Sequence, residues 1–153
     1  MTSSMVLAAD LKQSVEDVLS SFAGQIEPGP GVDSVDEVDT WLEAWVRITG
    51  AWEGEVALDV LGASAPAFAG AMLGTPPGEV AMEDTADALC ELVNMIGGQV
   101  KGSLPDGCRM SLPLIRMRRR NEGTATVRGM ADAATRTFDW AGHPLRVTIR
   151  TAP

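Results

Sequence analysis

The chain of 153 residues has the length of one domain and is long enough to bury one hydrophobic core. Its 45% hydrophobic and 22% charged residues are typical of a soluble globular protein, and no apolar run approaches the roughly 20 residues that cross a bilayer. A net charge of -9 argues against nucleic-acid binding, because phosphate contacts require a basic surplus. We therefore expect a single domain over residues 1–153 that binds neither nucleic acid nor membrane.

The two cysteines, Cys90 and Cys108, are too few for a disulfide framework. One falls in a predicted helix and the other at the start of a predicted strand, so we expect both to be free, partly buried thiols. Residues 1–10 contain neither a basic region nor a long apolar stretch, which argues against a secretory signal. A cytoplasmic location is the resulting expectation.

Charge is unevenly distributed along the chain. Residues 1–100 hold 2 basic and 17 acidic side chains, whereas residues 101–153 hold 10 basic and 4 acidic side chains. One explanation is that the two halves pack against each other within a single fold. The alternative is a positively charged docking surface around the arginine cluster at residues 116–120.

The N-terminal part of the chain combines a helix with a strand hairpin. Apolar residues recur at helical spacing over residues 6–24, and Gly24 is a suitable end for that helix. Prolines, glycines and acidic residues predict a loop over 26–38. Residues 41–49 and 55–61 are typical of two strands, joined by a turn with glycine at both ends.

The C-terminal part contains two helices and several strands. Residues 63–73 predict a short, buried helix, and residues 84–103 predict a long one. Strands are expected at 109–118 and 124–130, followed by a pair flanking residues 141–144. Because helices and strands come in blocks, we expect an α+β fold: an antiparallel or mixed sheet with the N-terminal helix and the long helix packed on one face.

The long helix has two distinct faces at about 100° per residue. The apolar face, which is expected to contact the core, contains Thr85, Leu89, Leu92, Val93, Ile96 and Val100. The opposite face contains Asp84, Asp87, Glu91, Asn94, Gly98 and Lys101. We expect this second face to be exposed to solvent or to a partner.

Asn94, Gly97 and Gly98 are unusual residues inside a helix. Asparagine forms helices poorly because its amide competes for backbone hydrogen bonds, and an interior glycine costs about 1 kcal/mol relative to alanine. A helix with these three residues close together either packs tightly against another element or presents its bare backbone to a partner.

Residues 87–101, DALCELVNMIGGQVK, resemble the signature helix of the CheC/CheX chemotaxis phosphatases. The signature is Glu-x-x-Asn followed four residues later by glycine, and the matching residues are Glu91, Asn94 and Gly98. The order of elements over most of the chain resembles the CheX branch. The resemblance implies a CheX-like homodimer that hydrolyses the phospho-aspartate of a CheY-like response-regulator receiver domain.

The resemblance also implies roles for individual residues. Asn94 is expected to enter the receiver's aspartate pocket and orient the attacking water, and Glu91 to pair with the receiver's lysine. Asp87, Gly98 and Lys101 on the same face are expected to contact the docked receiver. The receiver supplies its own Mg²⁺, so no cofactor or metal is expected on this chain. An acyl phosphate is already reactive, and positioning the water is therefore the main task.

The N-terminal helix contains a partial copy of this pattern. Glu16 occupies the place of Glu91, but Leu19 stands where Asn94 would be. CheC-type members of the family carry the signature twice. Because leucine cannot orient water, we expect one site per chain.

Two other functions remain open. The first is a catalytically silent CheX-like adaptor or binding module in two-component signalling, which a dephosphorylation assay would separate from a phosphatase. The second is a dimeric structural or small-ligand-binding domain, which a neighbouring receiver or histidine-kinase gene would argue against. The only histidine, His143, precedes Pro144 in a predicted turn, and we expect it to be exposed and uninvolved.

Overall fold

The computed structural model describes residues 4–21, 27–28, 40–119 and 130–152. The helices are α1 (Ser4–Ser20), α2 (Ala65–Leu73), the short 3₁₀ helix η2 (Pro77–Glu79) and α3 (Met82–Gly102). The strands are β1 (Glu27–Pro28), β2 (Thr40–Gly50), β3 (Gly54–Leu61), β4 (Cys108–Met110), β5 (Leu114–Arg119), β6 (Ala131–Trp140) and β7 (His143–Thr151). None of the described helices is long and apolar enough to cross a membrane.

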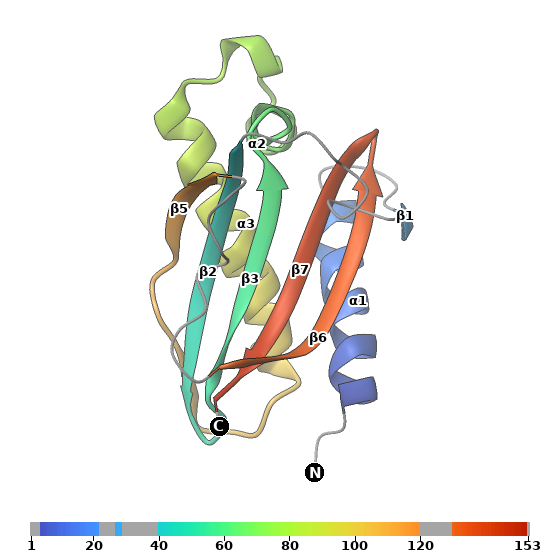
Figure 1. Ribbon diagram of the computed structural model, residues 1–153, viewed down its shortest axis with the longest axis vertical. Helices are drawn as coiled ribbons and strands as arrows, with labels where there is room; N and C mark the ends of the chain where they lie inside the picture. The colour runs from blue at the N-terminus through green and yellow to red at the C-terminus, as the bar shows by residue number, and fades with distance from the viewer. Residues whose placement is uncertain (1–3, 22–26, 29–39, 120–129, 153) are drawn as a thin grey trace.

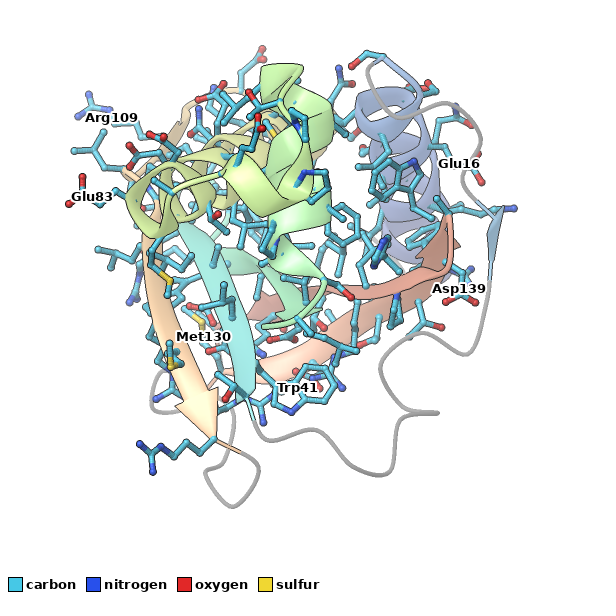
Figure 2. The ribbon with its side chains drawn as sticks, turned by 90° about the horizontal axis from the view of Figure 1, so that it is seen from above. Glu16, Trp41, Glu83, Arg109, Met130 and Asp139 are labelled. Atoms are coloured by element: carbon cyan, nitrogen blue, oxygen red, sulfur yellow. The ribbon has the colours of Figure 1, made fainter. Side chains whose placement is uncertain are left out.

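The strands form one sheet in the order β1-β6-β7-β3-β2-β4, and β5 pairs with β2 beyond the end of β4 (Figure 1). Every pairing is antiparallel. Helices α1 and α3 cover one face of this sheet, with α2 at the end where β3 finishes (Figure 1). Figure 2 shows the helices on one side of the sheet and Trp41 on the other. The predicted α+β fold is confirmed, and the sheet is antiparallel.

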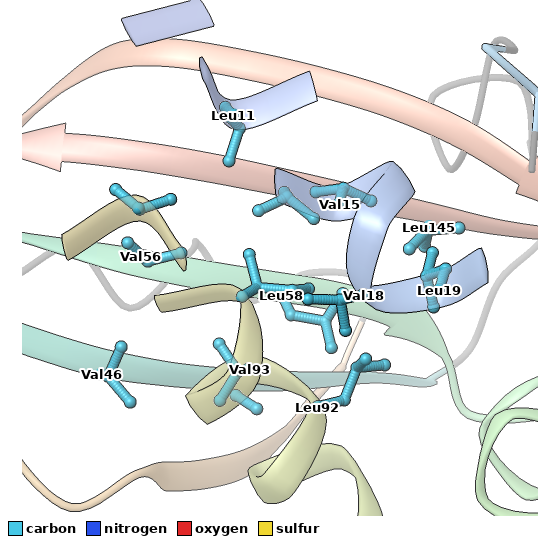
Figure 3. Close-up of a cluster of buried hydrophobic side chains, with 14 of the residues drawn as sticks. Leu11, Val15, Val18, Leu19, Val46, Val56, Leu58, Leu92, Val93 and Leu145 are labelled. Atoms are coloured by element: carbon cyan, nitrogen blue, oxygen red, sulfur yellow. The ribbon is translucent and has the colours of Figure 1, made fainter. Parts of the chain in front are cut away.

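The main hydrophobic core lies between the helix layer and the sheet (Figure 3). Leu11, Val15 and Leu19 of α1 are fully buried there, together with apolar residues of β2, β3 and β7. The residues predicted for the apolar face of α3 are all buried: Thr85, Leu89, Leu92, Val93, Ile96 and Val100. The helical period therefore fixed the orientation of α3 correctly, because burial of its apolar stripe stabilises only one rotation about the helix axis.

The strand expected at residues 109–118 is interrupted in the structure. It forms two short strands, β4 and β5, separated by Ser111–Pro113, and both pair with β2. At the break, the Ser111 backbone N–H donates to the Arg47 carbonyl at 2.8 Å, while the Arg47 N–H donates to the Ser111 hydroxyl at 2.9 Å. Pro113 lacks a backbone donor, which is incompatible with an unbroken ladder at this point.

Three other expectations fall partly or wholly outside the described residues. The structure does not describe Gly24, the predicted end of the first helix, or residues 124–129 of the strand expected at 124–130. Most of the expected loop at 26–38 is likewise outside, but Glu27–Pro28 form β1 and pair with β6, so the loop prediction is wrong for these two residues.

The sheet face opposite the helices carries buried ion pairs. The Asp59 Oδ2 atom accepts a hydrogen bond from Arg146 Nη2 at 3.1 Å, and the Glu55 Oε1 atom accepts one from Arg150 Nη1 at 2.8 Å. Both pairs join β3 to β7, and both carboxylates are at most 1% exposed. They link acidic residues of the N-terminal half to basic residues of the C-terminal half.

The arginine cluster of β5 contributes to the same face. Glu43 is fully buried and lies 3.4 Å from Arg116 and 4.0 Å from Arg118. Arg118 is itself buried, with its guanidinium 5.3 Å from the centre of the Trp41 ring. The interpretation that the two halves of the chain pack against each other is therefore confirmed for these arginines. Arg119 is exposed.

Asp59 has a perturbed carboxyl group. It faces Glu43 across the β2–β3 pairing, and both side chains are fully buried. Burial raises the pKa of Asp59 from its usual 3.8 to about 6, the charge of Arg146 opposes this rise, and Glu43 adds to it. Two carboxyl groups in close contact resist simultaneous ionisation.

Candidate functional site on helix α3

The ends of α3 carry charges that match the helix dipole. Glu83 and Asp84 lie in its first turn and Lys101 lies in its last turn. Acidic groups near the N-terminus and basic groups near the C-terminus each stabilise a helix by roughly 0.3–1 kcal/mol. At the start of the helix, the Thr85 hydroxyl donates to the Ala81 carbonyl at 3.1 Å. These end charges therefore stabilise α3, a helix of 21 residues.

Glu91 and Asn94 lie on the same side of α3. Glu91 is exposed and Asn94 is half-buried, and neither is part of the core. Their separation of three residues places the two side chains on neighbouring positions of one helix face. The structure thus brings together the two residues that the sequence singled out. A carboxylate that can accept hydrogen bonds lies beside an amide that can both donate and accept them.

The two adjacent glycines of α3 have different surroundings. A Cβ atom added to Gly97 would lie 2.6 Å from Val46 Cγ2 and 3.0 Å from Met110 Sδ, so Gly97 allows the helix to pack closely on the sheet. A Cβ added to Gly98 would meet nothing within 4 Å, and Gly98 is exposed. Both explanations that the sequence allowed for unusual helix residues therefore apply, one to each glycine.

The other residues expected at the docking face are also accessible. Asp87 is exposed and Lys101 is half-buried, one at each end of the Glu91–Gly98 segment.

Cys90 and Cys108 are free and half-buried, as expected. Burial, with a contribution from Asp87, raises the pKa of the Cys90 thiol, which keeps this thiol protonated at neutral pH. Cys90 is therefore a poor nucleophile.

An open groove of about 500 Å³ separates α3 from α1. It is lined by Asp17, Val18, Ser21, Met95, Gly98, Gln99 and Gly102. Gly98 thus belongs both to the groove and to the face that carries Asn94. The groove was not anticipated from the sequence, because its two walls belong to helices whose neighbourhood only the fold defines. In the sequence, the groove was indicated only by Gly98 and Gly102, two small residues four positions apart on α3.

Helix α1 uses its corresponding positions differently. Leu19 is fully buried in the core, whereas Glu16 is partly exposed and lies 3.8 Å from Lys12 on the same helix. The position that matches Asn94 therefore faces the sheet. Within the described part of the chain, this arrangement supports one site, on α3.

His143 differs from its expectation. It opens β7 instead of lying exposed in a turn, and its Nδ1 atom is 3.1 Å from the Ser64 hydroxyl. Its ring also lies near those of Phe68 and Trp140. The turn consists of Ala141 and Gly142, both with positive φ, so the hairpin is tighter than the Gly-His-Pro sequence indicated.

Among the described residues, no three His, Cys, Asp or Glu side chains are grouped in a way that could hold a metal ion.

The family model described as Chemotaxis phosphatase CheX matches residues 43–133. The match covers more than half of the chain and includes all of α3, with Glu91, Asn94 and Gly98. The chain therefore belongs to the CheX family.

Solved structures of related proteins share the fold. A chemotaxis protein CheX from Desulfovibrio desulfuricans is 24% identical, with 94% of this chain and 97% of that chain covered and a TM-score of 0.70. A putative chemotaxis protein from Desulfovibrio vulgaris Hildenborough is also 24% identical, with 94% of each chain covered and a TM-score of 0.71. CheX in a CheX-CheY-BeF3-Mg complex from Borrelia burgdorferi is 15% identical, with 95% and 97% covered and a TM-score of 0.67. Among curated proteins, no sequence matches this chain.

Proposed function

We propose that this protein dephosphorylates the phospho-aspartate of a CheY-like response-regulator receiver domain. The observation that carries the proposal is the face of α3, where Glu91 is exposed, Asn94 is half-buried and Gly98 leaves open space. Membership of the CheX family supports a phosphatase. The complex of CheX with CheY, BeF3 and Mg²⁺ from Borrelia burgdorferi supports a CheY-like partner.

In the proposed mechanism, Asn94 orients the attacking water. Its amide oxygen accepts a hydrogen bond from the water, and its NH₂ group donates to a neighbouring acceptor, which leaves a water lone pair directed at phosphorus. The water oxygen bonds to phosphorus as the bond between phosphorus and the receiver's aspartate oxygen breaks. The bridging oxygen stays with the aspartate carboxylate, and inorganic phosphate leaves with the oxygen and the two protons of the water. Positioning of this kind lowers the barrier by reducing the entropy lost on reaching the reactive geometry.

Glu91 fixes the register of docking. Its exposed carboxylate pairs with the receiver's lysine, one turn away from Asn94 on α3. Asp87, Gly98 and Lys101 complete the contact surface, with Gly98 allowing the receiver's loops to approach the helix backbone. The receiver supplies Mg²⁺ from its own aspartate pocket.

The proposal includes the organisation of the protein. We propose a single CheX-like domain over residues 1–153 that forms a homodimer, as its resemblance to the CheX branch implies. Sedimentation equilibrium of the full chain tests the second point. A mass of one chain at micromolar concentration would exclude the homodimer but would leave the chemistry of α3 untouched.

A dephosphorylation time course tests the function. Receivers from the same genome are phosphorylated with a small-molecule phosphodonor, and catalytic amounts of this protein are added. A shortened lifetime of at least one phospho-receiver is expected, with multiple turnovers per chain. If one receiver binds but its lifetime does not change, the protein is an adaptor. If none binds or responds, the proposal is wrong.

A further inference from the structure

One acidic side chain lines the groove between α1 and α3. Asp17 is the only ionisable residue among the described residues that line it, and its side chain is exposed. The ion pairs of the described residues do not include Asp17; its neighbour Glu16 has the nearby Lys12 instead. The Gln13 amide donates to Asp17 Oδ1 at 2.8 Å, which holds the carboxylate in place without neutralising it.

Asp17 lies at a position on α1 where the helix dipole favours a nearby cation. It lies in the last turn of the helix, which contains no basic residue. The C-terminal end of a helix carries partial negative charge, so a cation bound there is favoured. The carbonyls of this turn already accept from the protein's own hydroxyls, Ser20 to Asp17 and Ser21 to Val18. The carboxylate is therefore the charged group that the groove offers to a ligand.

The rest of the groove suits the stem of a long basic side chain. Val18 and Met95 supply apolar surface, and Gly98 and Gly102 supply space, since a Cβ at either glycine would meet nothing within 4 Å. Lysine and arginine bury their methylene stems along apolar surface while the charged head reaches a polar partner. A single carboxylate does not make a metal site, which requires several ligands.

The groove is continuous with the face proposed to dock the receiver. Gly98 lines the groove and also lies one turn, roughly 5–6 Å, beyond Asn94 along α3. The surrounding helix layer is acidic: α1 and α3 together carry seven acidic and two basic residues. A protein seated over Asn94 therefore approaches two helices that together carry net negative charge, and a basic surface complements them.

We propose that the α1–α3 groove receives a lysine or arginine side chain of the docked receiver domain, and that Asp17 is the residue that selects for it. This inference rests on the proposed function. It adds a second contact, separate from the Glu91–lysine pair, through which the protein distinguishes receivers with a basic residue at the matching position from those without one. Asp17 affects binding and takes no part in the chemical step.

Steady-state kinetics on the phospho-receiver separate this role from catalysis. Asp17→Asn is expected to raise KM about tenfold with kcat little changed, because a charge-assisted hydrogen bond is lost. Asp10→Asn is the matched control: the same change, two turns earlier on α1 and outside the groove. It should change KM less than twofold. Equal effects of the two variants would show a long-range charge effect and overturn the proposal, as would an unchanged KM for Asp17→Asn.

A charge exchange identifies the partner residue. Asp17→Lys should abolish binding to the cognate receiver, and a Lys→Glu or Arg→Glu change at the matching receiver position should restore it. If no basic residue near the receiver's phosphorylation pocket gives this rescue, the groove inference is wrong. If the wild-type protein is active and its turnover depends on Asn94 but not on Asp17, the groove proposal is wrong and the proposed function stands. A wild-type protein inactive on every receiver refutes both proposals.

Discussion

Helices α1 and α3 lie side by side on one face of the same sheet. Both carry the glutamate of the Glu-x-x-Asn pattern, and they differ at the position three residues later, where the signature has asparagine. In α3 that position is Asn94, which is half-buried. In α1 it is Leu19, fully buried against β-strands of the core. The two helices therefore differ in rotation about their axes as well as in sequence. The Glu-x-x-Asn pattern can therefore form a site only where burial of the helix's apolar residues leaves the asparagine position outside the core.

Loss of the amide of Asn94 should have the largest effect on function. Asn94→Ala is expected to lower the rate of phospho-receiver hydrolysis at least 100-fold, a typical cost of removing one positioned polar group from a transition state. The melting temperature should be unchanged or slightly higher, because alanine is the better helix former. The measurement is a single-turnover dephosphorylation rate together with a thermal melt. Full activity of a folded Asn94→Ala protein would contradict its proposed role.

Grafting the missing residue onto α1 tests the comparison directly. Leu19→Asn completes the Glu-x-x-Asn pattern on α1, but it should create no second active site because position 19 faces the core. It should instead destabilise the fold by roughly 3–5 kcal/mol, through lost apolar burial and an unpaired buried amide. Chemical denaturation measures this loss, and Leu19→Ala separates the two contributions. A Leu19→Asn, Asn94→Ala double variant with restored activity would refute the comparison.

Much of this arrangement could be predicted from the sequence, because a helical period and a signature motif are both local patterns. The orientation of α3 followed from its apolar stripe, and the polar face followed from that. The groove and the ion pairs Asp59–Arg146 and Glu55–Arg150 could not be predicted, because each joins segments far apart in the chain. His143 was placed wrongly for the same reason: its partner, Ser64, lies 79 residues away.

Stability should depend on pH through the sheet face that lies away from α1 and α3. The folded-state pKa of Asp59, about 6, is above its usual value of 3.8, so between these pH values the folded state holds a proton that the unfolded state lacks. Its contribution to the free energy of unfolding is therefore complete below about pH 4 and is lost as pH rises through 6, by about 3 kcal/mol.

Urea denaturation of the wild type and Asp59→Asn between pH 4 and 7 measures this contribution. Asparagine resembles the protonated carboxyl group, so the variant should lack the loss of stability on raising the pH. The difference in unfolding free energy between the two proteins should change by about 3 kcal/mol over this range. A constant difference would show that Asp59 titrates at its usual pKa.

The two glutamates should differ in their effect on binding. Glu91→Ala is expected to weaken receiver binding by roughly 1.5–3 kcal/mol, the value of a hydrogen bond to a charged group, with residual turnover at high receiver concentration. Glu16→Ala removes only a surface pair with Lys12, which is worth at most about 0.5 kcal/mol of stability, and should leave binding unchanged. Titration of both variants with the receiver decides the point. Equal losses would place Glu16 in the docking surface.

The smallest expected effect concerns the paired glycines of α3. Gly98→Ala should stabilise the fold by roughly 0.5–1 kcal/mol, because the new methyl group meets no neighbour and the helix gains propensity. Gly97→Ala should destabilise it instead, because its Cβ would lie 2.6 Å from Val46 Cγ2, a fully buried and conformationally stiff side chain. Thermal melts of the two variants should therefore shift in opposite directions.

The same position distinguishes a docking surface from an ordinary solvated helix face. Gly98→Leu should leave the protein folded, since the space beside Gly98 is open, but should block receiver binding by filling that space. If Gly98→Leu binds the receiver as the wild type does, the receiver does not approach the helix backbone at this point. A marked loss of stability for Gly98→Ala would contradict the prediction more deeply, because it would mean that this face of α3 is covered within the protein itself.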